Sequence, residues 1–184
     1  LSNCTNESIR SNVALAEFSG KVLVIDASIY IYKFLEERAL IENMYLFVSI
    51  LKHHAIIPVF IFDGKSPPEK KDLLDARRLK KKEAEKNYME LKALAGSDAN
   101  EDVESRLEVL RRQFIRMTND NIQATKDLLS ACGIHYFEAE READTLCAHM
   151  VIENKAWACV SDDMDMFVYG CPRVIRNISI TNQT

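Results

Sequence analysis

The sequence predicts an α/β domain in which a mainly parallel central sheet is flanked by helices and carries a long inserted helical hairpin. Short β-branched, apolar runs alternate with stretches of helical spacing, a pattern typical of parallel sheets. Five glycines and four prolines in 184 residues are few, which favours long helices over a turn-rich all-β fold. The chain length is that of one domain with a substantial core.

The first two strands are expected at residues 21–25 and 56–62, which are short apolar runs. Each run is followed by an aspartate, Asp26 after the first and Asp63 after the second. Between them, residues 27–51 place apolar side chains at helical spacing. We therefore expect a strand, a helical segment and a second strand.

A helical hairpin is expected next, as an insertion at about residues 66–131. Residues 69–94 contain no glycine or proline and are dominated by strong helix formers. Residues 96–100 combine a glycine stop with an N-cap signal. A second helical stretch then follows over about residues 102–131, loosened around residues 118–121.

Three further strands follow the hairpin, at residues 134–137, 156–160 and 173–178, with a helix at residues 142–153. The sequence contains no internal repeat and no low-complexity linker. Residues 1–184 are therefore predicted to form a single domain that contains the hairpin.

Acidic residues follow four of the expected strands at their carboxyl ends, the edge where open α/β sheets bind ligands. The candidates are Asp26 and Asp63 after the first two strands, Glu142 and Asp144 after the third, and Asp162, Asp163 and Asp165 after the fourth. So many carboxylates on one edge would repel one another, and burial would raise their pKa values. Hard divalent cations with oxygen ligands, Mg²⁺ or Mn²⁺, would compensate for this charge. So many acids are more than one Mg²⁺ needs and suit two such ions, the arrangement that supports in-line displacement at phosphorus.

Each of these acids also has a plain structural alternative. Asp26 alone could be the N-cap of the following helix. Glu142 and Asp144 lie where a helix dipole favours anions, and residues two apart share a helix face only at an irregular start. The three aspartates after the fourth strand, Asp162, Asp163 and Asp165, could belong to a solvated turn. The occurrence of all four acidic strand ends together favours the functional interpretation.

A basic segment follows Asp63 directly. Residues 65–82 carry a net charge of +5, whereas the remainder of the chain carries −9. The overall charge of −4 therefore does not argue against binding of nucleic acid. Lys70 and Arg77 are seven residues apart and share a helical face, with Arg78 and Lys81 close to it. We expect this face to hold a nucleic-acid phosphate.

Further along the hairpin we favour a solvated helix with i,i+4 ion pairs, such as Lys86 with Glu90. On the first helix, Tyr30 and Tyr32 offer two aromatic rings. One is expected in the core, and the other could stack on a base. Trp157 is expected in the core.

Several classes of protein are excluded. No apolar run approaches the roughly 20 residues of a membrane span. The five cysteines are an odd number without zinc-site spacing, which argues against a disulfide framework and for a reducing compartment, nuclear or cytoplasmic. The chain begins without a signal segment, so we expect that it is not secreted despite four N-x-S/T sequons.

Four ordered motifs resemble those of the flap endonuclease/XPG family of structure-specific 5′ nucleases. They are Val-Ile-Asp-Ala-Ser around Asp26, Phe-Asp-Gly-Lys-x-Pro-Pro around Asp63, Arg-Glu-Ala-Asp at residues 141–144 and Ser-Asp-Asp-Met-Asp at residues 161–165. The likeness covers residues 21–170. It implies that the hairpin is the family's helical arch and that the domain has a PIN-like 5′ nuclease core.

The resemblance also implies roles for individual residues. By motif position, two Mg²⁺ ions, which Mn²⁺ can replace, would be held by Asp26, Asp63, Glu142, Asp144, Asp163 and Asp165. Lys70 and Arg77 match the arch-base cations that engage the scissile phosphate, and Tyr32 matches the aromatic that stacks on the neighbouring nucleotide. Arg78 and Lys81 are then further substrate contacts. The implied partner is DNA with a 5′ flap or a single-strand/duplex junction in replication, repair or recombination, bound by a monomer.

The chain departs from the family's pattern in three respects. Asp144 stands where many flap endonucleases have glutamate, whereas the exonuclease branch often has aspartate. The family's N-terminal glycine-containing segment has no match. Nor do the seventh carboxylate, the helix–hairpin–helix region and the C-terminal motif for a sliding clamp. We therefore expect an incomplete enzyme.

Two rival functions stay open. A PIN-type ribonuclease has a similar acidic edge, but it usually lacks so long a basic hairpin. A truncated, catalytically inactive DNA-binding fragment is the non-enzyme alternative. A phosphatase with an aspartate nucleophile would need a second aspartate two residues after Asp26, where the chain has Ser28.

Overall fold

The computed structural model describes residues 9–65, 71–95 and 101–179. A five-stranded sheet lies at its centre, in the order β3-β2-β1-β4-β5, and every pairing is parallel. The strands are β1 (Val22–Asp26), β2 (Ile57–Phe62), β3 (His135–Glu138), β4 (Ala158–Val160) and β5 (Val174–Ile175). The predicted fold class is confirmed, and all five strands lie where the apolar runs place them.

Seven α-helices lie within the described ranges, with a short 3₁₀ helix, η2 (Leu15–Phe18), before β1. They are α1 (Ala27–Glu36), α2 (Leu40–His53), α3 (Lys71–Ala95), α4 (Glu101–Gln113), α5 (Asn119–Ala131), α6 (Ala143–Ile152) and α7 (Asp165–Val168). The single helical segment expected at residues 27–51 is two helices, because Arg38 takes a φ of 59° and its N–H donates to the Leu35 carbonyl. None of these helices is long and apolar enough to cross a membrane.

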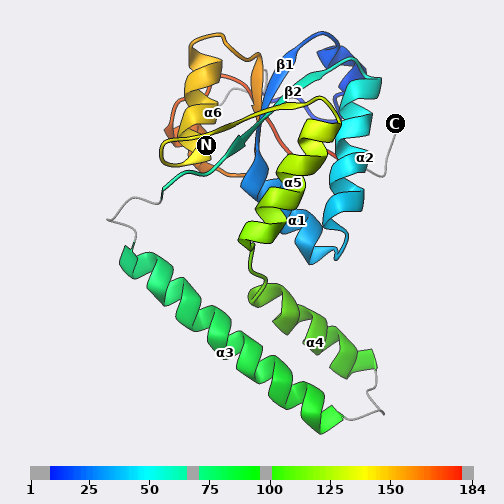
Figure 1. Cartoon of the computed structure of the whole chain (residues 1–184), viewed down its shortest axis with the longest axis vertical. Coiled ribbons are helices and arrows are strands. Elements are labelled where there is room, and N and C mark those ends of the chain that lie inside the picture. Colours follow the sequence, from blue (N-terminus) through cyan, green and yellow to red (C-terminus); the bar gives the residue numbers. More distant parts are fainter. Residues whose placement is uncertain (1–8, 66–70, 96–100, 180–184) are drawn as a thin grey trace.

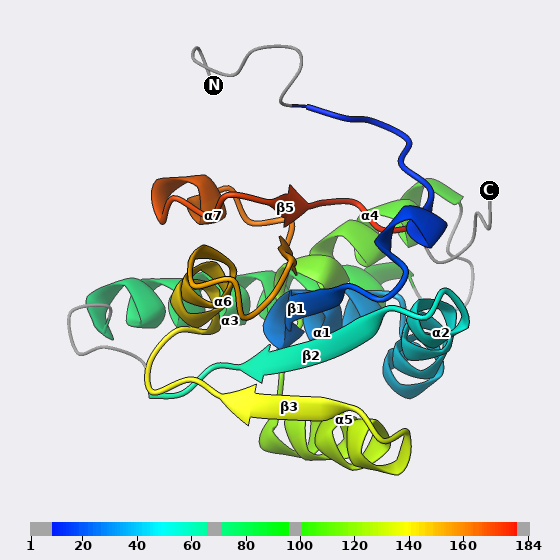
Figure 2. The same cartoon turned by 90° about the horizontal axis from the view of Figure 1, so that it is seen from above.

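Helices cover both faces of the sheet (Figures 1 and 2). Ile25 and Phe60 point to one face, where they pack with α1, α2 and α5. Val24 and Cys159 point to the other, against α6. This alternation follows from the two-residue period of a strand, and burial on both faces explains why the strands are apolar throughout.

Helices α3 and α4 extend away from the sheet as a packed pair (Figure 1). The ring of Tyr88 meets that of Phe114 edge-on, with centroids 5.3 Å apart. Helix α5 instead belongs to the core, where Leu129 is fully buried. The expected loosening around residues 118–121 is the start of α5, at which Thr118 and Asn121 form a capping box. The stop expected at residues 96–100 lies outside the described residues.

Candidate active site

The ends of β1 and β2 bring two aspartates to the same edge of the sheet. Asp26 is the last residue of β1 and also the N-cap of α1, so the structural alternative considered for it is real. In the β1–β2 pairing it stands opposite Ile61, two residues before Asp63. The Asp26 residue is only 7% exposed. Parallel pairing therefore places one buried and one exposed carboxylate side by side.

Ser28 connects these two carboxylates. Its backbone N–H donates to Asp26 Oδ1 at 3.0 Å, and its hydroxyl donates to Asp63 Oδ2 at 2.6 Å. The other Asp63 oxygen accepts a hydrogen bond of 2.9 Å from the backbone N–H of Ala143, in the first turn of α6. Asp63 is therefore held between α1 and α6, with its charge at the positive end of the α6 dipole.

The negative charge at Asp26 is poorly compensated. Burial, the nearby Asp63 and then Asp144 raise the pKa of Asp26 to about 7, although hydrogen bonds from the backbone of Ser28 and Ile29 oppose the shift. No lysine, arginine or histidine in the described part of the chain forms an ion pair with Asp26 or Asp63. This edge therefore has the electrostatics of a cation-binding site.

Glu142 and Asp144 lie at the start of α6, one before the helix and one inside it. Glu142 is the N-cap of the helix, in an extended conformation with φ −91° and ψ 137°, whereas Asp144 lies in the first turn. Burial and then Glu142 raise the pKa of Asp144, while hydrogen bonds from Thr145 and Tyr169 lower it. Because the N-cap is extended, Glu142 is not bound to the helical register of Asp144. The charge of Asp144 in turn contributes to the raised pKa of Asp26.

Asp163 and Asp165 follow β4, which is paired with β1. The Asp163 backbone N–H donates to the buried Ser161 hydroxyl at 3.1 Å, and Asp163 Oδ1 accepts from the Asp165 N–H at 2.9 Å. These bonds shape a turn that leads into α7. The neighbouring Asp162 points elsewhere, since its Oδ1 accepts from the N–H of Asn177. This turn lies at the same sheet edge, with its two aspartates bonded within the turn.

The donor chemistry of this edge fits a hard divalent cation, because carboxylate oxygens are the ligands that Mg²⁺ and Mn²⁺ prefer. Across the described ranges, however, no three His, Cys, Asp or Glu side chains stand close enough together to hold a metal ion. The structure thus brings Asp26 and Asp63 together through Ser28. The charge of Asp144 acts on Asp26, and the charge of Glu142 acts on Asp144. Asp163 and Asp165 share the edge without a direct contact to Asp26.

The basic residues expected near this edge differ in their surroundings. Lys70 lies outside the described residues. Arg77 and Arg78 are exposed on α3, and Arg78 forms an ion pair of 3.2 Å with Asp75. Lys81 is half-buried, and its Nζ donates to the Ile115 carbonyl at 2.7 Å. The expected basic face thus contains both solvated and engaged cations.

The two tyrosines of α1 separate into core and surface. Tyr30 is 1% exposed and its ring stacks on Phe47 with centroids 4.4 Å apart. Tyr32 is 40% exposed and lies 5.2 Å from Lys81 Nζ, measured to the ring centroid. Tyr32 is therefore the ring with a surface free for a base.

Sequence reasoning missed three residues that support the site: Ser28, Ser161 and Gly64. The N-cap signal belongs to Asp26 and indicates only that a backbone N–H two or three residues later donates to it. The bond from the Ser28 hydroxyl to Asp63 joins residues 35 positions apart and has no local signal. Gly64 donates its N–H to the Arg141 carbonyl at 2.7 Å, and a Cβ there would lie 1.9 Å from the Ala139 carbonyl oxygen. Only glycine lets the chain after Asp63 approach the loop after β3 so closely. Nothing local in the sequence indicates this approach.

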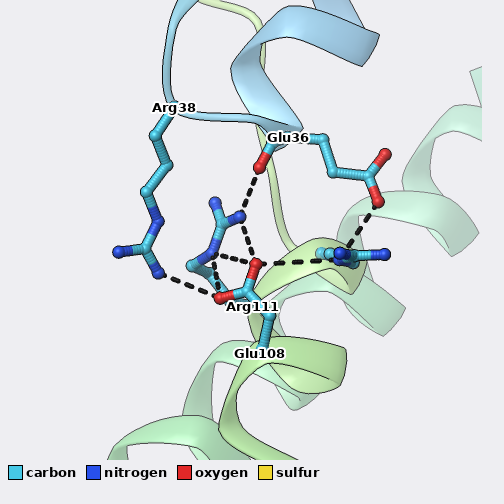
Figure 3. Close-up of polar contacts among 5 residues, drawn as sticks. Glu36, Arg38, Glu108 and Arg111 are labelled. Atoms are coloured by element: carbon cyan, nitrogen blue, oxygen red, sulfur yellow. Dashed lines mark hydrogen bonds and ion pairs between the residues drawn. The ribbon is translucent and has the colours of Figure 1, made fainter. Parts of the chain in front are cut away.

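A second polar cluster joins α4 to the end of α1 (Figure 3). Glu108 accepts hydrogen bonds from Arg111 Nη2 at 2.6 Å and from Arg38 Nη2 at 3.0 Å. Arg111 also donates to the backbone carbonyl of Glu36, and Arg112 pairs with the Glu36 carboxylate at 3.2 Å. We call these five residues the α1–α4 cluster. It holds the projecting hairpin to the core by charges of both signs.

Two family models match the chain: the XPG N-terminal domain over residues 2–84 and the XPG I-region over residues 133–184. The flap endonuclease 1 of Methanosphaera stadtmanae is 34% identical over 185 residues, covering 92% of this chain and 54% of the relative. The flap endonuclease 1 of Aeropyrum pernix is 32% identical, covering 95% of this chain and 52% of the relative. The chain thus spans about half the length of the curated relatives it matches.

Solved structures show the same likeness. The catalytic core of Rad2 in complex with DNA substrate superimposes with a TM-score of 0.64 at 26% identity, covering 90% of this chain and 46% of that one. Flap endonuclease-1 from Methanococcus jannaschii has a TM-score of 0.60 at 27% identity, covering 94% of this chain and 57% of that one. The acidic sheet edge and the projecting hairpin thus occur in a chain that is similar to nuclease cores.

Proposed function

The chain belongs to the flap endonuclease/XPG family, and on that basis we propose that it is the core of a structure-specific 5′ nuclease. Its reaction is hydrolysis of DNA phosphodiesters at a 5′ flap or a single-strand/duplex junction. The observation that carries the proposal is the buried carboxyl of Asp26 beside Asp63, where burial and like charge raise the pKa of Asp26 to about 7. A site that binds cations and phosphate together has this electrostatic character.

The six carboxylates at the sheet edge would hold two Mg²⁺ or Mn²⁺ ions, which when bound supply a more acidic water and stabilise charge on the leaving oxygen. The residues of the chain supply the positioning. Ser28 holds the carboxylates of Asp26 and Asp63 at fixed angles by its two hydrogen bonds. Such outer-shell bonds orient metal ligands and tune their basicity.

Basic residues of α3 would hold the substrate phosphate. Arg77 is exposed on the helix that follows Asp63, and Lys70 precedes it by seven residues. An arginine fork suits the paired oxygens of a phosphate, and its charge would offset negative charge that develops at the phosphorus. Arg78 would add a weaker contact, since its pairing with the exposed Asp75 is easily exchanged for phosphate.

An exposed aromatic ring completes the proposed site. Tyr32 lies on α1, the helix that Asp26 caps, so a base stacked on Tyr32 would place its phosphate near the carboxylates. Stacking of this kind tolerates any base, which suits an enzyme that recognises the shape of a junction and not its sequence.

Cleavage assays test the proposal. The protein is incubated with 5′-flap, nicked, blunt duplex and single-stranded RNA substrates, in Mg²⁺ and in EDTA. We expect cleavage near the flap base in Mg²⁺, abolished by EDTA and by Asp163→Ala. Cleavage confined to RNA would favour the ribonuclease alternative, and cleavage that survives Asp163→Ala would contradict the proposed site. Salt-sensitive flap binding without cleavage would favour a DNA-binding fragment.

A further inference from the structure

Lys81 connects three separate parts of the molecule. It belongs to α3, its Nζ donates to the carbonyl of Ile115 in the segment between α4 and α5, and the same Nζ lies 5.2 Å from the ring centroid of Tyr32 on α1. The adjacent Lys80 and Lys82 are exposed, whereas Lys81 is half-buried. Of these three consecutive lysines, Lys81 is the one whose ammonium group contacts other elements of the protein.

The groups around Lys81 also affect its pKa and hold the neighbouring segment in place. Burial, and then the neighbouring Arg116 and Arg77, lower the pKa of Lys81. Arg116 is itself paired with Glu85 at 2.7 Å, one helical turn beyond Lys81 on α3. The segment between α4 and α5 is thus held to α3 at two neighbouring points.

We propose that Lys81 is a positioning residue for Tyr32, not a ligand of the substrate phosphate. The ammonium lies against the Tyr32 ring and is held in turn by the Ile115 carbonyl, so the ring orientation depends on the closure of the hairpin onto the core. The exposed remainder of the ring is then presented to a nucleotide base in a fixed orientation. The role in presenting Tyr32 to a base rests on the proposed nuclease function. The contact between Lys81 and Tyr32 is independent of that function.

A double-mutant cycle tests the positioning role. Binding of a fluorescent 5′-flap DNA is measured in EDTA for the wild type, Lys81→Met, Tyr32→Ala and the double variant, over a series of salt concentrations. We expect Lys81→Met to weaken binding by about fivefold when Tyr32 is present and to have no further effect in Tyr32→Ala. The slope of log affinity against log salt is expected to stay unchanged, because no phosphate contact is lost.

A direct contact between Lys81 and a substrate phosphate predicts a different result in the same experiment. A phosphate ligand at Lys81 would give an additive loss in the Tyr32→Ala background and a salt slope smaller by about 0.9. Lys80→Met is the matched control, since it removes the same charge from the exposed face. Lys81→Arg, which keeps a cation and a donor, is expected to retain most of the affinity.

A measurement without DNA separates this inference from the proposed function. In protein labelled with 3-fluorotyrosine, the ¹⁹F resonance of Tyr32 is assigned by its loss in Tyr32→Phe. We expect Lys81→Met to shift this resonance and Lys80→Met to leave it in place. An unchanged resonance in Lys81→Met overturns the inference even if the protein cleaves flaps. If the protein binds no flap DNA, the proposed function fails, while the ¹⁹F shift still decides whether Lys81 orients Tyr32.

Discussion

Two groups of carboxylates in this molecule have opposite electrostatic surroundings. At the sheet edge, burial and neighbouring acids raise the pKa of Asp26 to about 7. In the α1–α4 cluster, hydrogen bonds from Arg111 lower the pKa of Glu108 to about 2, with further lowering by the charges of Arg111, Arg38 and Arg112. The charge of Glu108 is thus balanced by arginines within the protein, which fits a structural role. Asp26 has no such partner among the described residues, and its ionised form is disfavoured unless a cation balances it.

The two groups of carboxylates also differ in their exposure to solvent. The Glu108 side chain is 38% exposed, so its ion pairs are partly screened by water and weaken with added salt. Asp26 is buried, so its interaction with neighbouring charges is screened little. Substitutions at the sheet edge should therefore alter activity strongly, and substitutions in the cluster should alter mainly how the hairpin is held.

Asp26→Asn should have the largest effect. We expect a loss of cleavage of about a hundredfold or more, since a proposed metal ligand is replaced by a neutral amide. Initial rates on a 5′-flap substrate at saturating Mg²⁺ measure this loss. Retention of wild-type cleavage would show that the edge is not the active site.

The same variant should be more stable than the wild type in EDTA at high pH. The pKa of Asp26 is raised from 3.8 to about 7, so the folded state loses stability as pH rises between these values. The full difference is about 4 kcal/mol above pH 7 and vanishes below pH 4. Urea unfolding at pH 4.5 and pH 8 measures it, and an equal stability difference at both values would contradict this origin.

Gly64→Ala should rank second, because it displaces Asp63 without removing a charge. The added Cβ would lie 1.9 Å from the Ala139 carbonyl oxygen and 2.8 Å from the Glu140 carbonyl carbon, both backbone atoms. We expect a stability loss of about 1–3 kcal/mol from overpacking and a decrease in cleavage of about a hundredfold. Gly133→Ala is the control, since its Cβ would meet nothing within 4 Å although its φ of 67° costs some stability. Equal activity losses in the two variants would exclude displacement of Asp63 as the cause.

Ser28→Ala should have a smaller effect on the same edge. The variant loses the hydroxyl that donates to Asp63 and keeps the backbone N–H that donates to Asp26. We expect kcat to decrease by about tenfold, with little change in DNA binding. Single-turnover cleavage and flap binding measure the two quantities. Ser49→Ala, on α2, should match the wild type in both, and a similar decrease there would contradict a specific role for Ser28.

Glu108→Gln tests the neutralised group. Because the pKa of Glu108 falls from 4.5 to about 2 on folding, its contribution to stability is complete above pH 4.5 and is lost as pH falls towards 2. We expect the variant to have a lower thermal midpoint than the wild type at pH 7, and the gap to narrow below pH 4.5. Glu104→Gln, one turn earlier on α4, provides the comparison. A gap that is independent of pH would contradict the role of the Glu108 charge.

The smallest effect is expected from Lys86→Met. The Lys86–Glu90 pair, with N and O 3.6 Å apart, is an exposed i,i+4 contact on α3. Its loss should change stability by less than about 0.5 kcal/mol and leave cleavage unchanged. Chemical denaturation and flap cleavage measure both quantities. A large loss of cleavage would mean that the outer part of the hairpin contacts the substrate.

Much of the fold could be predicted because its signals are local. The run from Val22 to Ile25 is apolar at every position, as a strand covered on both faces must be, and Asp26 marks its end. The placement of acids at one edge followed from the same reasoning, since parallel strands end on the same side. The roles of these acids as metal ligands stay predictions.

Other features depend on segments that are distant in sequence. Tyr30 and Tyr32 are equivalent candidates by pattern, and only the packing of α2 decides that Tyr30 meets Phe47 in the core. Helix α5 continues the polar character of the hairpin in sequence, yet Leu129 anchors it against the core. Local spacing cannot distinguish these cases, because the partner that buries each side chain is chosen by the tertiary structure.

The sequence by itself determined the parallel α/β sheet, the acidic strand ends and the basic segment beside them, because strand and helix periods and charge are properties of neighbouring residues. Only the tertiary structure decided which side chains form contacts with one another. It placed Ser28 between two carboxylates and bound Lys81 to Ile115 and Tyr32. These contacts join residues 34 to 49 positions apart, and such pairings form only when separate elements pack together.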